Sequence, residues 1–185
     1  MAFLLKLKHW QLFLLTWGAG FLINLVAIIN IHLIMYAFPV MMLLFCVGLF
    51  GWIWAIATTL FRQLPPDTNM NLHLFKLLFS IPILYMLAIS VFMGVAMAHQ
   101  PVLQGSAMLT AMVFIVPLHL LSMVCIFYGL RFAAKVLKSV ELQREAHFGD
   151  YIGEFFLIWF SVVGVWILQP RISALVQQKQ AGLIG

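Results

Sequence analysis

The residues best suited to chemistry gather in one stretch of the chain, from Glu141 to Glu154. Four of the five acidic residues lie here, together with a histidine and an arginine. Carboxylates and an imidazole within a few helical turns can bind a divalent cation or transfer protons as acid and base. The same pattern is typical of a solvated helix with ordinary ion pairs, such as Glu141 with Arg144 or Lys138, and with Asp150 capping the next helix. We favour this second interpretation, because charge runs outside lipid need no special explanation.

Two further polar residues, Glu154 and His119, fall inside long apolar segments. Acids at such positions usually face a partner or a water-filled cavity, so Glu154 either forms an ion pair with a cation or has a functional role. The cations that the sequence suggests as its partners are Arg131, Lys135 and Arg144. His119 follows Pro117 by two residues, and we favour a neutral imidazole hydrogen-bonded inside the bundle over proton or metal chemistry. The candidate functional polar residues are therefore Glu154, His119, Asp150 and His147, and no catalytic or metal-binding residue is predicted.

The segments that must position these residues are unusually apolar. Residues 11–61 contain no Lys, Arg, Asp or Glu, whereas one helix needs only about 20 apolar residues to cross the hydrocarbon of a membrane. Charged residues make up 8% of the chain, against about 25% in soluble proteins. No strand-length alternation of the kind found in membrane barrels is present. The sequence therefore predicts an all-α integral membrane helical bundle.

We expect one membrane domain, residues 1–185, with about five transmembrane segments. The predicted spans cover residues 11–29, 33–61, 72–97, 106–130 and 151–168. The fourth helix should run on into an amphipathic connector over 131–147, on the cytoplasmic side, because Phe132, Val136 and Leu137 share one face. This connector lies on the membrane surface or packs on the bundle. The fifth segment is the shortest and carries Glu154, so a re-entrant or tilted half-span remains an alternative.

The distribution of Lys and Arg predicts the orientation. With the N-terminus in the cytoplasm, eight of the ten cations lie inside, and only Arg171 and Lys179 lie outside. Cytoplasmic segments of membrane proteins carry such an excess of Lys and Arg. A re-entrant last segment would place all ten inside. We therefore expect a multi-pass protein of the bacterial inner (cell) membrane with a cytoplasmic N-terminus.

The expected partners follow from the same charges. Three cations of the connector, Arg131, Lys135 and Lys138, are predicted to contact anionic lipid headgroups. Membrane lipids are therefore the expected partners, with other membrane proteins or a second copy of the chain as further candidates. Nucleic acid is not expected, because the cations flank the spans. No cofactor is predicted, and the two cysteines, Cys46 and Cys125, lack the spacing of a metal site and are expected to pack as small apolar residues.

Two stretches carry a resemblance to known proteins. They are Lys-His-Trp-Gln-Leu-Phe at residues 8–13 and Gly-Asp-Tyr-Ile-Gly-Glu-Phe-Phe-Leu-Ile-Trp-Phe at residues 149–160, closed by Gly164, Trp166, Pro170 and Arg171. In these the chain resembles a group of small polytopic bacterial membrane proteins. Members of that group often carry a proline in the middle of the last segment, where this chain has Ser161, Val162 and Val163. The resemblance implies a polytopic membrane protein and transfers no activity and no site residue.

These observations favour a non-catalytic membrane protein with an accessory, regulatory or lipid-interacting role. A first alternative is a small transporter or channel subunit that uses Glu154 and His119 in an aqueous path. A second is an interfacial enzyme acting on lipid through His147, Asp150 and Glu154. The sequence contains no complete pair of nucleophile and base, which makes an enzyme the less favoured class.

Overall fold

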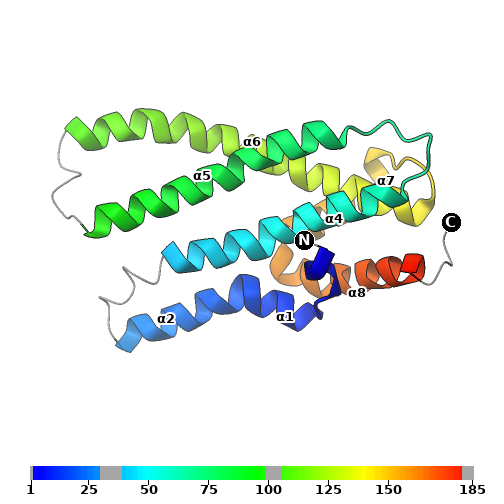
Figure 1. Cartoon of the computed structure of the whole chain (residues 1–185), viewed down its shortest axis with the longest axis horizontal. Helices are drawn as coiled ribbons and strands as arrows, with labels where there is room; N and C mark the ends of the chain where they lie inside the picture. The colour runs from blue at the N-terminus through cyan, green and yellow to red at the C-terminus, as the bar shows by residue number, and fades with distance from the viewer. Residues whose placement is uncertain (1, 30–38, 99–105, 181–185) are drawn as a thin grey trace.

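The computed structural model describes residues 2–29, 39–98 and 106–180 (Figure 1). Every regular element in these ranges is helical. The elements are η1 (Ala2–Lys6), α1 (His9–Phe13), η2 (Leu14–Gly18), α2 (Ala19–Ile29), η3 (Cys46–Phe50), α4 (Gly51–Leu60), η4 (Phe61–Gln63), α5 (Leu72–Ala98), α6 (Ser106–Leu142), α7 (Phe148–Trp159) and α8 (Ser161–Gln180). The prediction of an all-α fold is confirmed for this part of the chain.

Three of the described helices are long and apolar enough to cross a membrane. They are Pro39–Gln63, Leu72–Val95 and Met112–Leu142. Each corresponds to a predicted span, although residues 33–38 of the predicted second span lie outside the described ranges. Five spans are not confirmed, because the first and the last predicted spans, residues 11–29 and 151–168, do not correspond to any of these three helices.

The predicted fifth segment, residues 151–168, is divided into two helices at Phe160. The backbone of Phe160 leaves the helical region (φ −85°, ψ 55°), which ends α7 and lets α8 start in a new direction. The backbone of α8 at Gly164 lies very close to the backbone of α7 at Leu157. Only glycine fits there, because a Cβ atom at position 164 would lie 1.6 Å from the carbonyl oxygen of Leu157. Helix α7 has 12 residues, a length of about 18 Å against about 30 Å of hydrocarbon. Neither the sequence period nor the apolar composition signals this break.

The predicted amphipathic connector over residues 131–147 is not confirmed, although the fourth helix does run on past residue 130 as far as Leu142. Helix α6 continues without interruption from Ser106 to Leu142, with Pro117 inside it. It ends where Gln143 adopts a positive φ of 52°, a left-handed conformation common after a helix C-terminus. Ala133, Leu137 and neighbouring residues of this end are fully buried, and it packs against α4 and α7.

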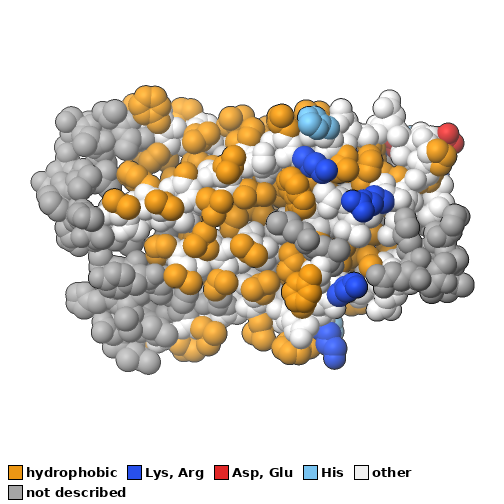
Figure 2. Space-filling model, viewed as in Figure 1, with side chains coloured by type: hydrophobic (Ala, Val, Ile, Leu, Met, Phe, Trp, Pro, Cys, Tyr) orange, Lys and Arg blue, Asp and Glu red, His pale blue; other side chains and the backbone are white. Residues whose placement is uncertain are grey.

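The packed core lies toward one end of the molecule. There η1, α4, the end of α6, α7 and α8 come together around Trp52, Leu137, Tyr151 and Leu168, which are all buried. Helices α5 and α6 extend away from this end as a long pair, with α4 between them and α2 (Figure 1). The visible face carries a broad apolar surface, and its Lys and Arg side chains gather toward the end with α7 and α8 (Figure 2). An apolar half and a charged end are the arrangement expected of a protein whose helices cross a membrane and whose cations lie on one side of it.

Candidate functional site: an ion-pair cluster on α6, α7 and α8

Four charged side chains from three helices meet at the polar end, and we call them the charge cluster: Lys138, Glu141, Glu154 and Arg171. Lys138 and Glu141 lie about one turn apart on α6, so they share a face of that helix. Glu154 comes from the second turn of α7, and Arg171 comes from the middle of α8. Helices α7 and α8 pack against each other after the turn at Phe160, and this packing brings Glu154 and Arg171 together.

The contacts of the charge cluster form a closed set. The Arg171 guanidinium donates from Nε to Glu141 Oε1 at 3.0 Å and from Nη2 to both oxygens of Glu141 at 2.7 Å. The same Nη2 donates to Glu154 Oε1 at 2.9 Å. Lys138 Nζ donates to Glu141 Oε2 at 3.3 Å and to Glu154 Oε1 at 3.2 Å. Each cation thus binds both carboxylates, and each carboxylate binds both cations.

The two positive and two negative charges of the cluster cancel, so its side chains act as structural partners of one another. The side chain of Glu154 is only 8% exposed, while that of Arg171 is 35% exposed. A buried carboxylate is tolerated when it is paired and hydrogen-bonded, and removal of one partner is then costly. Because both cations are shared, the cluster ties α8 to α6 and α7 at the end of the bundle.

Two further ion pairs lie beside the cluster, at the turn between α6 and α7. Lys135 Nζ lies 2.5 Å from Glu145 Oε1, and the backbone N–H of Asn69 donates to Glu145 Oε2 at 2.9 Å. The hydrogen bond from Lys135, followed by that from Asn69, lowers the pKa of Glu145. Arg144 Nη1 lies 2.9 Å from Asp150 Oδ2, and this hydrogen bond, followed by the one from the backbone N–H of His147, lowers the pKa of Asp150. Both carboxyl groups are therefore ionised at neutral pH.

Glu154 does have cation partners, but they differ from those that the sequence suggested. Lys138 and Arg171 bind it, whereas Arg131 donates from Nε to the hydroxyl of Tyr151 at 3.0 Å. A complete fifth span places Arg171 on the outer side of the membrane, away from Glu154. The predicted local pair of Lys138 with Glu141 is present.

His119 lies far from Glu154, on the surface of α6. Its Nδ1 lies 3.2 Å from the hydroxyl of Tyr85 on α5, and its ring is exposed. His119 precedes Lys138 by 19 residues on one helix, a separation of about 28 Å along the axis. The structure therefore does not bring together the two residues of the predicted transport path.

His147 and Asp150 stand at the start of α7 rather than in a pocket with Glu154. His147 is the exposed N-cap residue, and its backbone N–H donates to Asp150 Oδ2 at 3.0 Å. Asp150 caps the helix from its third position, not from the N-cap position that the sequence suggested. Within residues 2–29, 39–98 and 106–180, no three or more His, Cys, Asp or Glu side chains lie together so that they could hold a metal ion.

Sequence reasoning missed a second polar site, centred on Gln169 of α8. Gln169 is 1% exposed, its Oε1 accepts a hydrogen bond from Trp52 Nε1 at 2.8 Å, and its Nε2 contacts the carbonyl oxygens of Leu4, Leu5 and Leu7 at 2.8–3.2 Å. One side chain thus joins α8, α4 and the N-terminal helix η1. A glutamine beside Pro170 reads in the sequence as the end of a span, and no local signal pairs it with residues more than a hundred positions away.

Comparison of the chain with protein-family models, with curated proteins and with solved structures finds no match in any of the three.

Proposed function

We propose that this chain is a non-catalytic, multi-pass protein of the bacterial inner membrane with an accessory or lipid-interacting role. The observation that carries the proposal is the closed charge cluster. Its four side chains neutralise one another across α6, α7 and α8. The carboxylates with the clearest potential for chemistry are thus engaged in holding the polar end of the bundle together.

The proposed topology has α7 and α8 as a re-entrant hairpin on the cytoplasmic side. Arg171 of α8 contacts Glu141 near the end of α6, so both lie at one end of the bundle. The tip of the hairpin exposes large apolar side chains, among them Phe156, Trp159 and Phe160. Exposed aromatic residues at such a position suit the boundary between headgroups and hydrocarbon. In this topology the N-terminus and α8 both face the cytoplasm.

Labelling of single cysteines tests this topology in a background without Cys46 and Cys125. We expect Gln104→Cys, in the connection outside the described residues, to react with an impermeant thiol reagent in intact cells. Thr68→Cys and Gln178→Cys should react only after the membrane is opened, because both lie at the cytoplasmic end. Labelling of Gln178→Cys in intact cells would instead establish a complete fifth span. Labelling of Gln104→Cys only after lysis would reverse the orientation.

The variant Glu154→Gln tests the role of the charge cluster. Arg171 and Lys138 keep Glu141 as a partner in this variant, so we expect the free energy of unfolding in detergent to fall by only about 1 kcal/mol. The phenotype of the deletion strain should be complemented as well as by the unchanged protein. Glu141→Gln is the matched comparison and should cost more, because Glu141 accepts the paired bonds from Arg171.

A titratable path through Glu154 predicts a different result for the same variant. The protein would then keep its full stability, fail to complement, and lose ion flux measured in reconstituted vesicles. That outcome would replace the present proposal with the transporter class.

A further inference from the structure

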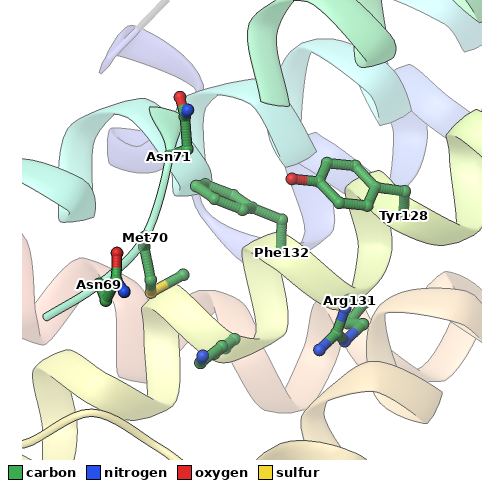
Figure 3. Close-up of a pocket in the computed structure, with 7 residues that line it drawn as sticks. Asn69, Met70, Asn71, Tyr128, Arg131 and Phe132 are labelled. Atoms are coloured by element: carbon green, nitrogen blue, oxygen red, sulfur yellow. The ribbon is translucent and has the colours of Figure 1, made fainter. Parts of the chain in front are cut away.

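A polar pocket of about 180 Å³ lies between α6 and the segment that leads into α5. Asn69 and Asn71 line it from that segment, and Tyr128, Arg131 and Lys135 line it from one face of α6. These α6 positions are three and four residues apart, so they lie along the same side of the helix. Figure 3 shows the extended segment with Asn69, Met70 and Asn71 beside the turns of α6 that carry Tyr128, Phe132 and Arg131, with the amide of Asn71 pointing away from α6.

The lining offers hydrogen-bond donors and no carboxylate. Arg131 donates from Nε to the hydroxyl of Tyr151 at 3.0 Å, which fixes the guanidinium while its Nη1 and Nη2 groups have no protein partner among the described residues. Asn71 Oδ1 accepts from the backbone N–H of Leu74 at 3.0 Å, so its amide hydrogens remain available. The Tyr128 hydroxyl likewise forms no hydrogen bond to any residue of the described ranges. Fixed donors around a cationic guanidinium are the chemistry that binds a phosphate group.

The acid nearest to this lining is already neutralised. Glu145 receives Lys135 on one carboxylate oxygen and the backbone N–H of Asn69 on the other. It is not among the lining residues. The pocket therefore keeps the positive charge of Arg131, and Lys135 Nζ retains donors beyond the one that it shares with Glu145.

The pocket stands where the apolar surface of α6 begins. Residues 77–130 carry no formal charge, so Arg131 is the first charged residue after a long apolar stretch. Val124 and Leu121 precede Tyr128 by four and seven residues, and thus share its side of the helix. They are 67% and 49% exposed. A donor-lined pocket at the end of an exposed apolar strip matches the two parts of a phospholipid, a phosphate headgroup and acyl chains.

We propose that this pocket binds the phosphate of an anionic phospholipid, whose acyl chains lie along the α6 strip of Leu121 and Val124. Arg131 holds the phosphate through its two Nη groups, and Tyr128 and Lys135 donate to the remaining oxygens. This inference rests on the proposed lipid-interacting function and names both the lipid class and its site.

Binding of phosphatidylglycerol to the full chain in neutral detergent tests the proposal, with phosphatidylcholine and inorganic phosphate as the other probes. We expect phosphatidylglycerol to bind more tightly than either, and Arg131→Gln to weaken that binding about tenfold or more, because charge-assisted hydrogen bonds to the phosphate are lost. Tyr128→Phe removes one hydroxyl and should weaken binding a few fold. Lys76→Gln, which removes the same charge from the exposed surface of α5 outside the pocket lining, should leave it nearly unchanged.

The possible outcomes distinguish a failure of this phosphate-binding pocket from a failure of the proposed lipid-interacting function. Equal weakening by Arg131→Gln and Lys76→Gln would reduce the interaction to unspecific charge attraction and overturn the pocket, while a lipid-interacting role would remain. Inorganic phosphate that binds as tightly as phosphatidylglycerol would overturn the lipid and leave a phosphate site. Absence of binding by any phospholipid would overturn both proposals. Should Arg131→Gln fail to fold, Tyr128→Phe and Arg131→Lys carry the test, and unchanged binding in both would overturn the site.

Discussion

The variant Gly164→Ala is expected to lose about 3 kcal/mol of the free energy of unfolding, although alanine is the better helix former. The added Cβ atom would lie 1.6 Å from the carbonyl oxygen and 2.5 Å from the carbonyl carbon of Leu157. Both are backbone atoms of α7, so no side-chain rotation relieves the clash. The turn between α7 and α8 must open, which also separates Glu154 from Arg171. Unfolding in detergent, followed by circular dichroism, measures the change.

Gly153→Ala is the matched control for this variant. Gly153 also lies inside a helix, but a Cβ atom there meets nothing within 4 Å. We therefore expect the free energy of unfolding to rise, by about 0.5–1 kcal/mol, because alanine loses less conformational freedom on folding. Opposite signs for the two substitutions would establish the tight turn at Phe160. A gain in both variants would instead mean that α7 and α8 form one continuous helix.

The long helices of this fold could be predicted from the sequence, because apolar length determines them directly. The run without charge from residue 11 to residue 61 and the prolines at 65 and 66 predict where helices lie and where they stop. The division of the last segment could not be predicted in the same way. Phe160 and Ser161 carry no breaker signal, and Gly164 is ordinary in membrane helices. The break depends on the contact of Gly164 with the backbone of Leu157, which is a property of the packed hairpin.

Only the pair of Lys138 and Glu141 within the charge cluster could be predicted from the sequence. Lys138 and Glu141 are three residues apart on a helix, and that spacing by itself predicts an ion pair. Glu154 and Arg171 are brought together by the turn at Phe160, so an interpretation with a fifth span placed them on opposite sides of the membrane. The alternative of a re-entrant last segment places all ten cations on one side of the membrane. Charge alone did not separate the two topologies, because both satisfy the excess of cytoplasmic cations.

The second large effect is expected at Gln169, where a leucine of similar size should lower the free energy of unfolding by about 3 kcal/mol. The substitution leaves the buried N–H of Trp52 without its acceptor, and it leaves the carbonyl groups of Leu4 and Leu7 without the amide that binds them. A buried polar group without a partner costs about 1–3 kcal/mol. Leu5 keeps the hydroxyl of Ser173, at 3.0 Å from its carbonyl oxygen. We therefore expect η1 to detach first and to become sensitive to protease while the rest of the bundle remains folded.

The exposed glutamine at position 178 of the same helix provides the control. Gln178→Leu should change the free energy of unfolding by less than about 0.5 kcal/mol, because no buried partner is lost. A double-mutant cycle with Trp52→Phe isolates the bond between Trp52 and Gln169. The combined loss should be smaller than the sum of the single losses, since each single variant already removes that bond. Strict additivity, together with an N-terminus that stays protected in Gln169→Leu, would show that η1 is held by apolar packing alone.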